Sequence, residues 1–92
     1  MPAVWLFRVF DAFNVRGNGW ILVPGVPRDD PKIAVGDSIE LRGGTAPARR
    51  AVVKAVGVFA RGETHMPILV ELEPTDRPLI LNADVWRLGD EE

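Results

Sequence analysis

The chain has 92 residues, of which 47% are hydrophobic and 26% charged, and its formal net charge is −2. These values are ordinary for a globular domain and exclude an intrinsically disordered chain, while a chain this short buries only roughly 60–65% of its unfolded surface, enough for one core. The small net negative charge argues against nucleic-acid binding over the whole surface, and the lack of cysteine excludes disulfides and thiolate metal sites.

The composition predicts short strands and many turns. Eight prolines and nine glycines leave little room for helices, because proline lacks a backbone donor and glycine favours other conformations. Residues 1–89 are expected to form one domain, followed by an acidic tail at 90–92. We expect a cytoplasmic protein without a signal peptide, and no apolar run approaches the roughly 20 residues that span a membrane.

The first strand is predicted over Val4 to Phe10. Alternation places Trp5, Phe7 and Val9 on one face of this strand and the remaining residues on the other. Both faces are largely apolar. A small barrel turns only one face of each strand inward, so this excess indicates that something covers the outer face.

A hairpin and a proline loop come next. Gly17-Asn18-Gly19 tolerates positive φ and suits a tight turn, after which Trp20 to Val23 is the returning strand. The segment from Pro24 to Pro31 is predicted as a loop because its three prolines remove backbone donors. A turn at Ile33 to Asp37 then leads into the next strand.

The second half of the chain continues the pattern of strand and turn. Ser38 to Arg42 reads as a half-buried strand with Ile39 and Leu41 pointing inward. Further strands are predicted at 49–59, with a bulge near 55–57, at 67–72, at 79–81 and at 85–88, and the segment 60–66 is predicted as a loop. The fold class is therefore all-β, a small closed or partly open antiparallel barrel.

Three segments resemble the β-barrel second domain of translational GTPases, the family of elongation factor Tu. Phe7 to Gly19 is similar to that domain's opening strand and Gly-x-Gly hairpin. Pro24-Gly25-Val26 is similar to its glycine turn, and Ile33 to Leu41 to its hydrophobic-x-Val-Gly-acid turn and following strand. Val53 to Phe59 with Gly62-Glu63 echoes a later strand more faintly. The resemblance covers nearly the whole chain and implies a translation-factor barrel.

The resemblance also bears on function. The chain contains no Gly-x-x-x-x-Gly-Lys-Ser/Thr loop, so nucleotide hydrolysis is not expected. In the family this barrel helps to hold the aminoacylated end of tRNA through an acid and an arginine beside a phenylalanine. Phe59 matches that phenylalanine, but Gly57 and Ala60 stand where the acid and the arginine are expected. Thr64 replaces a family asparagine, so the charged contacts are missing.

The leading prediction is a non-catalytic module that docks on a protein partner or associates with itself. In the translational GTPases the barrel packs against neighbouring domains, so a similar free-standing surface is expected to bind another protein. The docking face is predicted to be the outer apolar face of the first two strands. Its four residues are Val4, Leu6, Phe10 and Trp20.

The alternative is an RNA- or tRNA-binding accessory domain. The stretch from Leu41 to Gly62 has five basic residues and no acidic one, which would suit contacts with phosphates. Phe59 would add a stacking surface for a base. The alternative site consists of Arg49, Arg50, Lys54, Phe59 and Arg61.

Little in the sequence indicates catalysis. His65 is the only histidine, and Glu63 and Thr64 are too few neighbours for a metal site or a catalytic triad. Asp29 and Asp30 read as a solvated turn. We therefore expect neither an enzyme nor a bound cofactor or metal.

Overall fold

A computed structural model describes residues 3–16, 19–43, 47–57, 64–72 and 77–89. Within these ranges the chain forms seven strands and one short helix. The elements are β1 (Val4–Arg8), β2 (Asp11–Val15), β3 (Gly19–Pro27), β4 (Ser38–Arg42), β5 (Arg49–Val56), β6 (His65–Glu71), α1 (Arg77–Ile80) and β7 (Asp84–Arg87). The predicted all-β class is confirmed.

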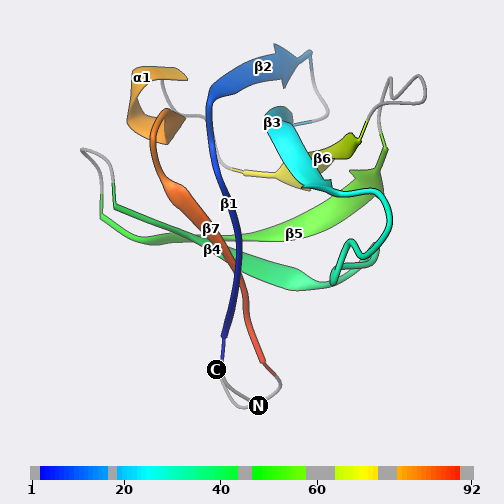
Figure 1. The fold of residues 1–92 in the computed structure, drawn as a ribbon. Helices are drawn as coiled ribbons and strands as arrows, with labels where there is room; N and C mark the ends of the chain where they lie inside the picture. Colours follow the sequence, from blue (N-terminus) through cyan, green and yellow to red (C-terminus); the bar gives the residue numbers. More distant parts are fainter. Residues whose placement is uncertain (1–2, 17–18, 44–46, 58–63, 73–76, 90–92) are drawn as a thin grey trace.

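All seven strands belong to one antiparallel sheet, which curls into a half-barrel (Figure 1). The strand order is β1-β7-β4-β5-β6-β3-β2, so the two edge strands are consecutive in the chain. Val9 donates its amide to Ala83 beside β7, whereas the amide of Phe10 bonds to Val23 in β3. One bent N-terminal segment therefore joins both edges of the sheet.

The core fills the inside of this curl. Its fully buried side chains come from nearly every element and are mostly β-branched or leucine, as expected for inward positions of strands. They are Leu22, Ile39, Ile68, Ile80, Val9, Val26, Val53, Val70 and Val85. No polar or charged residue is buried among the described residues. The half-barrel thus presents its polar side chains on its outer face and at its ends.

A β-bulge in β1 breaks the predicted alternation of the first strand. Trp5 pairs with Trp86 and Phe7 with Val85, so Leu6 is an extra residue in the ladder. Leu6 and Phe7 are consequently both buried, and Trp5 is 51% exposed. The prediction that Trp5 shares a face with Phe7 and Val9 is therefore wrong.

Two segments differ from their predicted structure. β3 continues through Pro24 to Pro27, because this half of the strand has a ladder to β6 on one side only and its prolines need not donate on the other. Residues 79–81 were expected to form a strand but lie at the end of α1 and beyond it. Pro78 suits the first turn of a helix, and Asn82, at φ 66°, leaves it in the left-handed conformation.

The remaining predicted elements are largely confirmed. Ser38–Arg42 is a strand over the predicted residues, and the bulge expected near 55–57 lies between Val53 and Ala55. β6 starts at His65, two residues earlier than predicted. No helix in the described part of the chain is long and apolar enough to cross a membrane.

Candidate functional site

The predicted docking face is not a single surface. Leu6 and Trp20 are each only 7% exposed and belong to the core. Leu6 is buried because of the bulge, and Trp20 because it lies on the inward face of the sheet, opposite the buried Val70 of β6. Val4 is half-buried against the same core. Phe10 alone is open, at 83% exposure. The outer face predicted from these four residues is therefore wrong for Leu6 and Trp20.

The predicted basic site is described in part. Arg50 and Lys54 are both exposed at alternate positions of β5, as expected for one strand face. Arg49 is half-buried and lies opposite the buried Leu41. Phe59 and Arg61 lie outside the described residues, as does Ala60, one of the three departures from the family pattern, whereas Gly57 and Thr64 are described.

A different surface crosses the outside of four neighbouring strands. Trp5 in β1 lies opposite Trp86 in β7, which lies opposite Glu40 in β4, which lies opposite Arg50 in β5. Each of these residues in β7, β4 and β5 has at least one buried sequence neighbour, so the row faces outward. The buried neighbours are Val85, Ile39, Leu41 and Ala51. We call this row, together with Arg42, the Trp–Arg strip.

Charged contacts hold the middle of the strip in place. The Nε of Arg42 donates to Glu40 Oε1 at 2.5 Å, and the Nε of Arg50 lies 3.4 Å from Glu40 Oε2. The guanidinium of Arg42 lies 5.0 Å from the ring centroid of Trp86, within the range of a cation–π interaction. The hydrogen bond from Arg42, with a smaller contribution from Arg50, holds the pKa of Glu40 below its ordinary value against the effect of desolvation.

A second carboxylate fixes the other end of the strip. Asp84 Oδ1 accepts hydrogen bonds from Arg8 Nε at 3.2 Å and from the Trp5 indole at 3.1 Å. These two bonds, that of Arg8 first, lower the pKa of Asp84. Trp5 is thus oriented by a hydrogen bond although half of its surface is exposed. An oriented, exposed aromatic side chain is well suited to contact a partner.

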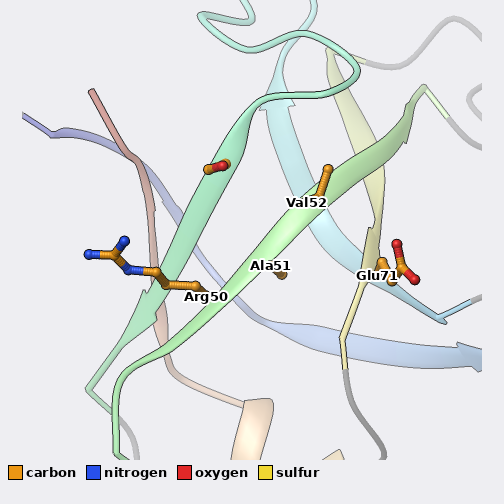
Figure 2. Close-up of a pocket in the computed structure, with 5 residues that line it drawn as sticks. Arg50, Ala51, Val52 and Glu71 are labelled. Carbon is orange, nitrogen blue, oxygen red and sulfur yellow. The ribbon is translucent and has the colours of Figure 1, made fainter. Parts of the chain in front are cut away.

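A shallow pocket of about 250 Å³ adjoins the strip and shares Arg50 with it. Figure 2 shows Arg50 and Glu71 on opposite sides of this pocket, with Val52 between them. Ser38 and Ala51 complete the lining. The pocket therefore offers an exposed apolar residue flanked by a cation and a carboxylate, which is the arrangement of a small polar-rimmed contact site.

The described residues contain no group of three or more histidine, aspartate or glutamate side chains that could hold a metal ion. His65 is exposed at the start of β6, and its Nδ1 lies 3.1 Å from the hydroxyl of Thr64. Comparison with protein-family models, with curated proteins and with solved structures finds no match.

The sequence contains part of the signal for the strip. Alternation in Ser38–Arg42 places Glu40 and Arg42 on the same face, opposite Ile39 and Leu41. The partners of that face come from β1 and β7, which are separated from β4 by long stretches of chain. Neither this pairing nor the bulge that turns Trp5 outward follows from strand periodicity.

Proposed function

We propose that this chain is a non-catalytic binding module that docks on a protein partner through the Trp–Arg strip. The observation that carries the proposal is the oriented, half-exposed Trp5 beside Trp86, with Arg42 stacked on Trp86. Tryptophan and arginine are the residue types most enriched where binding energy concentrates in protein interfaces. Side chains already held by hydrogen bonds lose little conformational entropy on binding.

The arginines of the strip support docking rather than a chemical step. Arg42 and Arg50 share the carboxylate of Glu40, and Arg8 is engaged with Asp84. Each arginine already has a carboxylate partner, which lowers the cost of desolvating it when a partner covers the surface. Arg42, Arg50 and Glu40 together keep one net positive charge beside the tryptophans. Such a surface gives specificity through complementary charge and affinity through the tryptophans.

Site-specific photo-cross-linking in a native cell extract tests the proposal. A photoreactive residue at position 5 should give a discrete protein adduct, and the same residue at Val35, which is 64% exposed on a different part of the surface, should give none. Arg42→Glu should reduce the adduct about tenfold, because it reverses a charge in the middle of the strip. Equal adduct yields from positions 5 and 35, or an adduct yield that Arg42→Glu does not change, would contradict the proposal.

RNA binding is the second candidate. It is favoured by Arg50 and Lys54, which are both exposed on β5. Arg50 lies opposite Glu40, which in turn lies opposite Trp86 on the same outer face. A phosphate-led complex weakens steeply as salt rises, whereas an apolar one changes little. Titration into labelled tRNA at low and moderate salt, with Arg50→Glu and Lys54→Glu as variants, tests it. A tRNA affinity that neither substitution changes would rule out Arg50 and Lys54 as the RNA-binding site.

We further infer that the half-barrel is of the type found in the second domain of translational GTPases and that the protein acts in the cytoplasm. The fold type is supported by the order of the motifs along the elements. The Phe7 to Gly19 motif covers the end of β1, β2 and the hairpin, and the motif ending at Leu41 leads into β4. A crystal structure whose strand order differs from β1-β7-β4-β5-β6-β3-β2 would overturn this assignment. The location rests on the absence of cysteine.

A further inference from the structure

The middle of the Trp–Arg strip holds a guanidinium group between a tryptophan ring and a carboxylate. Glu40 lies opposite Trp86 in the neighbouring strand. Arg42 donates to Glu40 Oε1 while its guanidinium lies 5.0 Å from the Trp86 ring centroid. The other carboxylate oxygen, Oε2, lies 3.4 Å from the Nε of Arg50. Each oxygen of this carboxylate therefore contacts one arginine, and one of the two arginines is stacked on the ring.

Trp5 and Asp84 form a second pair of a tryptophan ring and a carboxylate. The Trp5 indole and the Arg8 Nε both donate to the same oxygen, Asp84 Oδ1, at 3.1 and 3.2 Å. Among the residues that the structure describes, Asp84 Oδ2 accepts no hydrogen bond and no cation stacks on Trp5. This pair therefore lacks the stacked arginine that the pair of Glu40 and Trp86 has.

Both members of the second pair can be reached from outside. Trp5 is 51% exposed, and the Asp84 side chain keeps 27% of its surface. A side chain at position 43 would contact Oδ2, since a Cβ there would lie 4.0 Å from this oxygen, but the residue is glycine. An incoming side chain can therefore contact the ring and approach this oxygen from the outer face of the sheet.

A pocket of about 250 Å³ beside Trp5 gives space for the stem of a long side chain. Its other lining residues are Leu6, Pro27, Asp30, Pro31 and Lys32. The charged groups of Asp30 and Lys32 lie 4.0 Å apart, so they offset each other at the rim. The aliphatic stem of an arginine packs readily along an apolar surface of this kind while its charged end stays in contact with water.

The net positive charge of the strip is too distant to oppose another arginine at Trp5. This charge lies mainly at Arg50, because Glu40 is closer to Arg42. Arg50 is in β5, three strands away from Trp5 in β1. Three strand spacings are roughly 14 Å, longer than the screening length of about 8 Å at physiological salt.

We propose that the protein partner of the strip presents an arginine side chain whose guanidinium stacks on Trp5 and donates to Asp84 Oδ2. Arginine suits the site better than lysine, because a planar guanidinium can stack on a ring and bond to a carboxylate at the same time. The partner's arginine would repeat at Trp5 the arrangement that Arg42 makes at Trp86. This inference rests on the proposed function and names the chemical group that the strip recognises.

Titration of the isotope-labelled protein with N-acetylargininamide, followed by NMR, tests the site without the partner. The indole signal of Trp5 should shift saturably, and that of the buried Trp20 should not. The lysine analogue has the same charge but no planar group, so it should bind about threefold more weakly. The citrulline analogue, which has nearly the same shape and no charge, should bind more weakly still. Equal affinities for the arginine and citrulline analogues would overturn the proposal.

The Asp84→Asn variant tests the carboxylate. Asparagine keeps an acceptor for the Trp5 indole but removes the charge, so the affinity for N-acetylargininamide should fall about threefold, as expected for one exposed ion pair. Asp29→Asn is the matched control, because it removes the same charge from an exposed loop position and should bind like the wild type. An unchanged Trp20 signal shows that each variant is folded. Equal affinities in the two variants would contradict the role of Asp84.

Hydroxyl-radical footprinting in native cell extract connects the site with the partner. The oxidation of Trp5 is measured relative to that of Phe13, which cancels any radical scavenging by the added compound. Millimolar N-acetylargininamide should reverse the protection of Trp5 by the extract, and the citrulline analogue should not. Protection that the arginine analogue does not relieve would overturn this inference and leave docking intact. No protection of Trp5 in the extract would contradict docking itself, and with it the partner's arginine.

Discussion

Two glycines of β3 lie very close to the backbone of β6. A Cβ on Gly25, at φ +92°, would lie 1.8 Å from the Met66 carbonyl oxygen, and one on Gly19, at φ +114°, would lie 2.1 Å from the Val70 carbonyl oxygen. In both cases the obstructing atom is a backbone oxygen of β6, which cannot move without breaking the ladder between β3 and β6. At these positions the sequence therefore requires glycine for space as well as for backbone conformation.

Substituting Gly25 by alanine should lower the free energy of unfolding by about 2–5 kcal/mol, the sum of left-handed strain and overpacking. Gly36 is the matched control, because it also has a positive φ, +96°, but nothing lies within 4 Å of its added Cβ. Gly36→Ala should cost only about 1–2 kcal/mol. Urea unfolding of both variants measures the difference, and equal losses would show that the close approach to β6 does not matter.

The carboxylates of Glu40 and Asp84 make stability depend on pH. Arginine hydrogen bonds lower the pKa of each below its ordinary value in the folded protein. The unfolded chain therefore takes up protons first as the pH falls. The stability that these groups contribute is present above their unfolded pKa values, about 4, and is lost as the pH falls through the lower folded values.

The Asp84→Asn variant should accordingly lose less stability than the wild type on acidification below about pH 4. It should also be less stable than the wild type near neutral pH, because Arg8 and the Trp5 indole lose their charged acceptor. Urea midpoints measured at a series of pH values test both statements. If the urea midpoints of the two proteins change with pH in the same way, Asp84 does not contribute to the pH dependence of stability.

The conformations of the strands β1 and β3 determine which aromatic residues are available to a partner. The bulge at Leu6 turns Trp5 outward, while β3 keeps Trp20 in the core. Trp20→Ala should therefore cost about 3–5 kcal/mol of stability. Trp5→Ala should cost no more than about 1 kcal/mol, since half of its surface is exposed.

Thermal and urea unfolding of the two tryptophan variants measures this contrast, and Trp86→Ala, at a half-buried position, should fall between them. Similar losses for Trp5→Ala and Trp20→Ala would contradict the placement of Trp5 on the surface. The contrast also matters for binding experiments. A loss of binding in a Trp20 variant would report unfolding, whereas a loss in a Trp5 variant would report the surface.

Local sequence patterns predict the elements here better than they predict the site. Ser38–Arg42 follows from alternation, and β2 pairs with β3 as the predicted hairpin requires, although its turn residues Gly17 and Asn18 lie outside the described residues. The strand predicted at 79–81 is wrong because Pro78 and Asn82 favour a short helix, from which Ile80 packs into the core. The Trp–Arg strip could not be predicted, because it depends on a bulge and on pairing between strands distant in the chain.

For the whole molecule, exposed aromatic side chains mark separate parts of the surface. Trp5 is on the strip, Phe10 lies at the bend between β1 and β2, and Phe13 is on β2. All three are at least 51% exposed, so each can report whether its own surroundings become covered. Together they allow the docking face to be located without assuming in advance where it is.

Hydroxyl-radical footprinting of the protein, at one concentration in buffer and in native cell extract, tests the central claim most directly. Equal protein concentrations cancel any effect of self-association. If the Trp–Arg strip is the docking face, the extract should slow the oxidation of Trp5 several-fold and leave that of Phe10 and Phe13 unchanged. Protection of Phe10 or Phe13 with Trp5 still fully reactive, or no protection of any of the three, would contradict it.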